Sequence, residues 1–98
     1  MESASVIEIL KAHQDELKSA GIVHLRLFGS VARNSAHPGS DVDLMAEFDR
    51  TKRYTLLSMV RLENRLSDLL GVRVDLAPED TMKESIRARA LREAVHAF

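Results

Sequence analysis

Two short stretches define how this chain is organised: FGSVAR at residues 28–33 and SDVDL at residues 40–44. In the first, a Gly-Ser turn follows an alternating segment; glycine lets a backbone approach an oxyanion, and a serine hydroxyl can donate to it. In the second, Asp41 and Asp43 stand two apart, so in a strand they project to the same side, about 6.5–7 Å apart along the backbone. Carboxylates at that separation can converge on one hard cation or bridge two. The two stretches therefore predict a site for phosphate and magnesium.

Strands are expected on either side of the turn. Residues 22–28 alternate apolar and polar side chains, the pattern of a half-buried strand. Residues 42–48 place apolar side chains on one face and their acidic residues, Asp43 among them, on the other. A third strand is expected over 72–76, where Asp75 stands between two apolar neighbours and a proline follows.

Helices are expected between and around these strands. The spacing of apolar residues predicts one helix over 5–20 and a longer one over 55–70, each stopping at a glycine. A short helix is expected at 31–33, directly after the turn. The letters TMKE at 81–84 form the pattern of a capping box, which opens a last helix reaching to about 97. The residues of the 55–70 helix expected to face inward are Leu56, Met59, Val60, Leu66, Leu69 and Leu70.

The elements alternate as α-β-α-β-α-β-α, which is an α/β (α+β) arrangement, and 98 residues suffice for one domain spanning 1–98. Cysteine is absent, and the four histidines lack metal-ligand spacing, so any metal is expected on carboxylates. A net charge of −1 argues against a general nucleic-acid binder. No apolar run approaches the roughly 20 residues of a membrane span and no signal peptide opens the chain, so a cytoplasmic protein is expected.

Each part of the predicted site has an ordinary structural explanation when taken alone. Gly29-Ser30 can be a simple tight turn, Asp41 with Asp43 a solvated strand edge, and Asp75 an edge or capping residue. Three carboxylates gathered without a cation would repel one another and raise each other's pKa values. The combination on strands therefore favours a cation site over coincidence.

The source of positive charge for the phosphates stays open at this point. Arg33 follows the turn and either contacts phosphate or is a solvated arginine. The alternative sources are Arg50, Lys52 and Arg53 in the loop after the second strand.

In the order of these motifs the chain resembles the minimal nucleotidyltransferases, the MNT group of the polymerase-beta-like superfamily, along essentially its full length. Members of this group are commonly the antitoxins of helical HEPN-domain ribonuclease toxins. The resemblance implies a small mixed sheet with helices packed on it, and nucleotide binding by Gly29 and Ser30. It implies two Mg²⁺ ions on Asp41 and Asp43, with Asp75 as the third metal-side carboxylate that helps deprotonate the acceptor.

The reaction implied by the resemblance is transfer of AMP from ATP to a tyrosine of the toxin, with release of pyrophosphate. Two positions depart from the common family pattern: Val31, where a polar, basic or aromatic residue is frequent, and Asn34, where glycine is frequent. Asn34 still suits a left-handed turn.

No second lobe is evident to enclose an acceptor, so the partner toxin is expected to supply that wall in a hetero-oligomer. The last helix carries more apolar residues than one core-facing stripe needs, so its other side is expected either to fold onto the sheet or to dock a partner or a second copy. Two alternatives to the adenylyltransferase antitoxin stay open. One is an antitoxin that acts by binding alone, and the other is a nucleotidyltransferase for a small-molecule or RNA acceptor.

Overall fold

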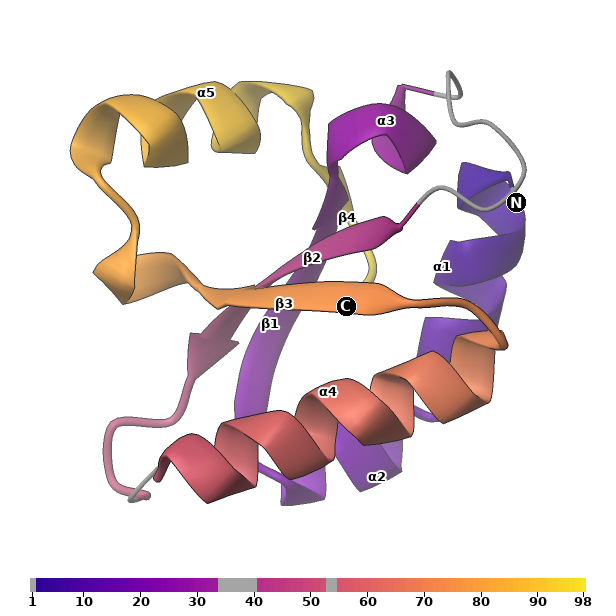
Figure 1. The fold of residues 1–98 in the computed structure, drawn as a ribbon, viewed down its shortest axis with the longest axis vertical. Coiled ribbons are helices and arrows are strands. Elements are labelled where there is room, and N and C mark those ends of the chain that lie inside the picture. The colour runs from indigo at the N-terminus through magenta and orange to yellow at the C-terminus, as the bar shows by residue number, and fades with distance from the viewer. Residues whose placement is uncertain (1, 34–40, 53–54) are drawn as a thin grey trace.

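Four strands form one mixed sheet in the order β3-β2-β1-β4 (Figure 1). In the computed structural model, which describes residues 2–33, 41–52 and 55–98, β1 (Ile22–Phe28) pairs antiparallel with β2 (Val42–Phe48). β2 pairs parallel with β3 (Val74–Pro78), and β4 (Val95–His96) pairs antiparallel with β1. The mixed sheet agrees with the expected fold class. Asn34 and Arg53, which carried expectations of their own, lie outside the described residues.

One face of the sheet packs against helices α1 (Ser3–Ala12), α2 (Gln14–Ser19) and α4 (Leu56–Leu70). Alternate residues of the strands supply this core, as the period of two predicts. The helices contribute residues at helical spacing, and burying them is the main source of stability in a chain of this size. The fully buried large side chains are Val6, Leu10, Leu17, Ile22, Leu25, Leu27, Val31, Val42, Leu44, Met45 and Leu66.

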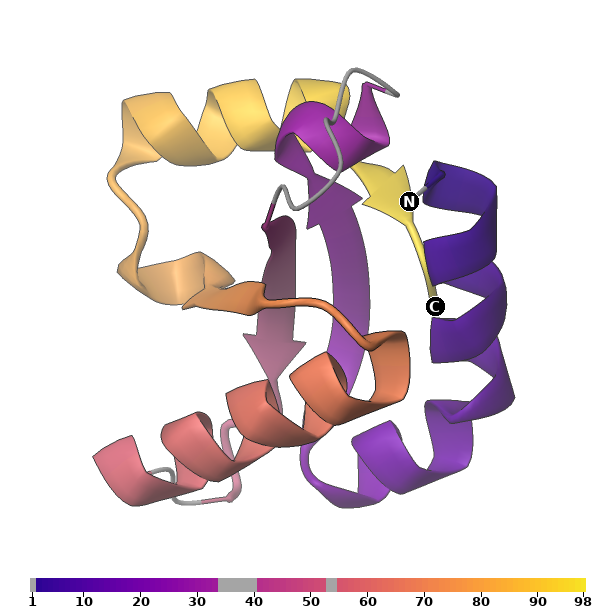
Figure 2. The ribbon, with the colours of Figure 1, turned by 45° about the vertical axis from the view of Figure 1, so that its right-hand side comes forward.

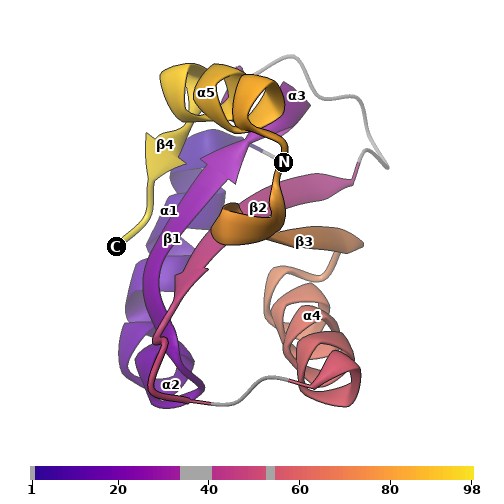
Figure 3. The same cartoon turned by 90° about the vertical axis from the view of Figure 1, so that its left-hand side faces the viewer.

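The opposite face of the sheet lies toward η1 (Glu79–Thr81) and α5 (Glu84–Glu93), as the side view in Figure 3 shows. Met45 projects to this face and is fully buried, so the face that carries the acidic residues is partly covered rather than open to solvent. α3 (Gly29–Ala32) stands where β1 ends, close to the last turn of α5 (Figure 1). Among the described residues, no helix is long and apolar enough to cross a membrane.

Several predicted elements have the expected bounds. The strands over 22–28 and 42–48 are confirmed, and the helix over 55–70 is confirmed from its second residue. Thr55 is its N-cap, since the Thr55 hydroxyl accepts from the Ser58 amide at 3.1 Å, and Gly71 ends it in the left-handed region at φ 69°.

The N-terminal helix was predicted as one segment and is two. His13 leaves helical geometry at φ −106° and ψ 17°, and its amide donates to the carbonyls of both Ile9 and Leu10 at 3.2 Å. The bond to Leu10 spans three residues instead of four, so it closes a tighter turn than the α-helix does and ends α1. The second helix, α2, begins at the next residue in a new direction. Leu17 of α2 is thereby still fully buried.

The C-terminal segment differs more. The last helix ends at Glu93, because Ala94 is extended (φ −69°, ψ 145°) and the following residues form β4 beside β1 (Figure 2). The Ala97 amide donates to the Leu25 carbonyl at 2.9 Å, and Phe98 is buried in the core. Of the apolar residues that suggested a second helical stripe, Ala94, Val95 and Phe98 lie beyond α5, whereas Ile86, Ala90 and Leu91 stay on it. Ala90 is buried and Ile86 is 52% exposed, so docking on the other side of α5 stays a prediction.

The prediction of a capping box at residues 81–84 is also wrong. Thr81 donates its hydroxyl to the Pro78 carbonyl at 3.0 Å and closes η1, while α5 begins after Lys83 without a side-chain cap. The third strand runs two residues later than expected and includes Pro78 as its last residue, a position open to proline on an edge strand.

Two residues of α4 that were expected to face inward are exposed: Leu56 at 83% and Val60 at 45%. The buried residues of α4 are Leu62, Leu66 and Leu70, and none lies before Leu62. The apolar spacing correctly identified the helix but not the length over which it touches the sheet.

Candidate active site

The turn at Gly29 is built for a glycine in two ways. Gly29 has φ +76°, a region that side chains other than glycine rarely adopt, and it begins α3 directly after the extended residue Phe28. A Cβ at this position would collide with the carboxylate of Asp43 and lie 3.1 Å from its Cγ. The bare backbone of the turn therefore lies directly against one of the predicted site carboxylates.

Strand register brings the other parts together. Asp43 lies opposite Phe28 of β1 in the antiparallel pair and opposite Asp75 of β3 in the parallel pair. Neighbouring strands lie about 4.8 Å apart, and residues paired in register project to the same face. Asp43 is therefore the centre of the site, with the Gly29 turn on one side and Asp75 on the other. Asp41 precedes β2 by one residue and is exposed.

The electrostatics of Asp43 match this central position. Burial raises the pKa of the Asp43 carboxyl, and the negative charges of Asp75 and Asp41 raise it further, while Arg33 opposes them. The ionised carboxylates thus repel one another across the strands. A positive ion between them would remove that cost.

The residues present fit magnesium as an incomplete cage. Across residues 2–33, 41–52 and 55–98, no group of three or more His, Asp or Glu side chains is already closed around a metal position. Mg²⁺ prefers carboxylate oxygen and usually binds through one or two carboxylates, completing its shell with water and substrate phosphates. The donors here are carboxylate oxygens, and because Gly29 lacks a Cβ, the Asp43 carboxylate can lie directly against the turn. Water and phosphate oxygens are the ligands that would complete such a shell.

The remaining predicted site residues lie on and after α3. Ser30 is half-buried in its first turn. Val31, the departure from the family pattern, is 1% exposed in the core, so its side chain anchors the turn and does not face a ligand. Arg33 follows α3, and its Nη1 donates to Glu93 Oε2 of α5 at 2.9 Å.

The alternative basic residues are placed elsewhere. Lys52 donates its Nζ to the Ser19 carbonyl at 3.2 Å, next to the start of β1, whereas the Gly29 turn is at its end. Arg50 lines a cavity beside η1. Of the described basic residues considered for phosphate binding, Arg33 is the one near the carboxylates.

Sequence reasoning missed the residues that hold Asp75 in place. β3 is an edge strand, and its outward amides would otherwise lack protein partners. Ser67 Oγ accepts from the Val74 amide at 3.1 Å, and Glu63 Oε2 accepts from the Leu76 amide at 3.0 Å. Both side chains come from α4, four residues apart on one face. They fix the backbone on both sides of Asp75.

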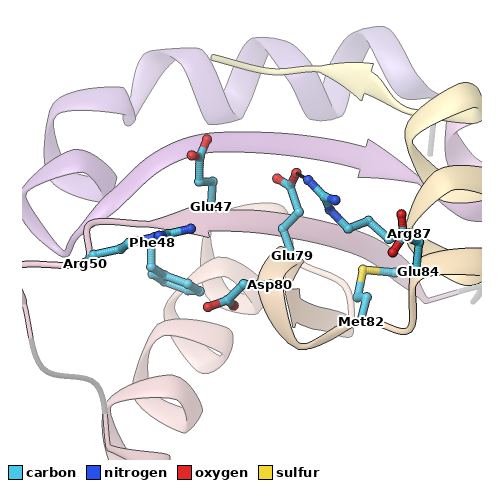
Figure 4. Close-up of a pocket in the computed structure, with 8 residues that line it drawn as sticks. All are labelled: Glu47, Phe48, Arg50, Glu79, Asp80, Met82, Glu84 and Arg87. Carbon is cyan, nitrogen blue, oxygen red and sulfur yellow. Dashed lines mark hydrogen bonds and ion pairs between the residues drawn. The ribbon is translucent and has the colours of Figure 1, made fainter.

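A cavity of about 340 Å³ lies on the same face, toward the far end of β2 (Figure 4). Glu79 lines this cavity and accepts from Arg26 Nη1 of β1 at 2.7 Å and from Arg87 Nη2 of α5 at 3.1 Å. These contacts fix α5 over the sheet. The residues lining the cavity are Glu47, Phe48, Arg50, Glu79, Asp80, Met82, Glu84 and Arg87.

A Gly-Ser turn leaving one strand, with carboxylates on the next two strands of the sheet, β2 and β3, defines the class of nucleotidyltransferases. The chain belongs to the family described as nucleotidyltransferase domain, whose profile it matches over residues 6–96. It is similar to the protein adenylyltransferase MntA of Thermococcus cleftensis, with 39% identity over 89 residues that cover 90% of this chain and 88% of the relative. A structure solved as a candidate minimal nucleotidyltransferase has 39% identity and a TM-score of 0.73, covering 97% of this chain and 95% of that one. The resemblance to minimal nucleotidyltransferases is confirmed.

More distant solved structures share the fold. A toxin-antitoxin complex with AMP-PNP has a TM-score of 0.73 at 16% identity, covering 90% of this chain and 72% of that one. A tri-AMPylated Shewanella oneidensis HEPN toxin in complex with MNT antitoxin has a TM-score of 0.67 at 14% identity, covering 94% and 71%. At such identities the likeness concerns the fold alone.

Proposed function

We propose that this chain is an antitoxin that transfers AMP from ATP to a tyrosine of a HEPN-domain ribonuclease toxin and thereby neutralises it. The observation that carries the proposal is the register that puts Asp43 between the Gly29 turn and Asp75. Similarity at 39% identity to a relative named as a protein adenylyltransferase supports a protein acceptor. The fold shared with MNT antitoxins in complex with HEPN toxins supports the choice of partner.

In this proposal the turn holds the nucleotide. The backbone at Gly29 and the Ser30 hydroxyl bind the triphosphate, and the Arg33 guanidinium adds positive charge beside it. Asp41, Asp43 and Asp75 hold two Mg²⁺ ions, which when bound supply neutralisation of charge on the phosphates and activation of the attacking oxygen. Asp43 and Asp75 are fixed on two paired strands, so they are in place before the substrate arrives, which is what phosphoryl-type transfer mainly requires of a protein.

The chemical step is a displacement at the α-phosphorus of ATP. A tyrosine phenol has a pKa near 10, so at neutral pH its proton must be removed for efficient attack. Asp75 is exposed and accepts this proton, the phenolic oxygen forms a bond to the α-phosphorus, and the bond from that phosphorus to pyrophosphate breaks. The products are an AMP-tyrosine ester and pyrophosphate.

Label transfer tests the reaction. The chain is incubated with its HEPN-domain partner, Mg²⁺, and ATP labelled on either the α- or the γ-phosphate. The proposal expects label on the partner from the α-position only, and none with the Asp41→Asn, Asp43→Asn double variant. Asp15→Asn, which removes an exposed carboxylate of α2, is the matched control and keeps the labelling. Label on RNA or a small molecule with the partner absent would contradict the proposal.

A further inference from the structure

The last turn of α5 is joined to the nucleotide-binding turn by one ion pair. Glu93 is the final residue of α5, and its Oε2 accepts from Arg33 Nη1 at 2.9 Å, across 60 residues of sequence. The Arg33 side chain is 52% exposed, so its guanidinium would otherwise sample many rotamers. Its position near the carboxylates is consistent with its effect on the pKa of Asp43, which it lowers.

We propose that Glu93 is a positioning residue that orients Arg33 for the phosphates of ATP. The inference rests on the proposed function and adds to it a residue that touches neither the nucleotide nor the acceptor. The contact engages one terminal nitrogen of Arg33, and a guanidinium carries five N–H donors in a fixed plane. Holding one edge of this plane sets the direction of the others, so less side-chain entropy is lost when phosphate binds.

The position of Glu93 is itself fixed from the other end of α5. Arg87 in the first half of the helix contacts Glu79, which also accepts from Arg26 of the sheet. The Glu79 side chain is 12% exposed, so its carboxylate is shielded from solvent, whereas Arg87 is 45% exposed. Ala90, between the two links, is buried. The helix therefore presents Glu93 to Arg33 from a defined place.

Glu93 affects ATP binding in two opposite ways. Its negative charge repels the phosphates, whereas its contact with Arg33 orients the guanidinium, and substitutions can separate these two effects. A carboxylate near the phosphates repels them, so if repulsion dominated, both Glu93→Ala and Glu93→Gln would tighten ATP binding. If orientation dominates, Glu93→Ala weakens binding, whereas Glu93→Gln retains it because the amide oxygen still accepts from Arg33. The positioning role requires the second pattern.

The test is calorimetric titration of the full chain with ATP and Mg²⁺, together with steady-state transfer to the partner. We expect Glu93→Ala to raise the Kd and KM for ATP about two- to fivefold, the range of an exposed ion pair, with kcat unchanged. Glu93→Gln should behave as the native chain. The matched control is Glu84→Ala, which removes a carboxylate from the other end of α5 and should leave ATP binding near native.

Coupling to Arg33 completes the test. If Glu93 acts through Arg33, the double variant Arg33→Ala, Glu93→Ala binds ATP no more weakly than Arg33→Ala alone. Additive losses, or a Glu93→Ala variant that binds ATP as tightly as or more tightly than the native chain, would overturn the positioning role while leaving the proposed function standing. A native chain that binds no ATP would overturn both.

Discussion

Asp43 of β2 lies directly opposite Asp75 of β3, in a parallel register that also places Val42 opposite Val74. The two carboxylates belong to strands joined by the whole of α4, yet they share one face of the sheet. Their mutual repulsion contributes to the raised pKa of the Asp43 carboxyl. A pair that costs free energy in the empty protein is what a cation-dependent site requires.

Replacing Gly29 tests the turn. Gly29→Ala should cost about 1–2 kcal/mol of folding free energy for the left-handed backbone and abolish nucleotide binding, because its Cβ collides with the Asp43 carboxylate. Gly71→Ala is the matched control. Gly71 has φ +69°, but a Cβ there meets no atom within 4 Å, so a similar stability loss should leave binding intact. Urea unfolding and ATP titration of both variants measure this; equal loss of binding in the two would refute the role assigned to the turn.

Removing the charge of Asp43 tests the repulsion. Since the pKa of Asp43 is raised on folding, its ionised form destabilises the metal-free protein at pH above that pKa, and this cost disappears as the pH falls through it. Asp43→Asn in EDTA at pH 7 should therefore unfold at a temperature no lower than the native chain. Added Mg²⁺ and ATP should raise the Tm of the native chain but not that of the variant. A variant that is clearly less stable in EDTA would argue against the repulsion.

The edge of β3 can be loosened through Glu63. Glu63→Ala leaves the half-buried Leu76 amide without its acceptor and should cost about 1–2 kcal/mol, with a lower kcat because the backbone beside Asp75 is less fixed. Glu63→Gln keeps an acceptor oxygen, so it should retain most of the folding free energy and most of the kcat of the native chain. Denaturant unfolding and steady-state transfer are the measurements. Equal kcat for the Ala variant and the native chain would show that Asp75 is held without this bond.

The two contacts of Glu79 should differ in strength. Glu79→Ala leaves Arg26, which is 23% exposed, without its 2.7 Å partner and should cost about 1–3 kcal/mol. Arg87→Ala removes only the contact between Glu79 and Arg87, whose side chain is 45% exposed. Its loss of folding free energy should be well below that of Glu79→Ala, because solvent screens this contact. Thermal unfolding of the two variants gives the order. A larger loss for Arg87→Ala would mean that α5 is held differently.

The parts of the fold that follow from local pattern were predictable. The alternation in residues 22–28 and 42–48 identified both central strands, and with them Gly29 and Asp43 at their ends. β4 could not be predicted in this way, because two residues are too few to show the alternation of a strand. Their pairing with Arg26 and Leu27 also joins distant parts of the chain. Local apolar spacing continued the last helix through them instead.

The residues that support the site could not be predicted from the sequence either. Glu63 on α4 reads as an ordinary solvated charge, and only the packing of the helix beside β3 shows that it accepts from the Leu76 amide. The link between Arg33 and Glu93 spans 60 residues and depends on where α5 lies. Ligand-facing residues stand out by motif, whereas residues that position them are defined by tertiary contacts.

The central claim is covalent transfer of AMP to the partner, and intact-protein mass spectrometry of the HEPN-domain partner tests it most directly. The native chain and the Asp41→Asn, Asp43→Asn variant are each incubated with the partner, ATP and Mg²⁺. We expect a mass gain in multiples of one AMP unit, located on tyrosine by peptide fragmentation, with the native chain and none with the variant. A stable complex whose partner keeps its unmodified mass in the presence of the native chain would contradict the claim and favour an antitoxin that acts by binding alone.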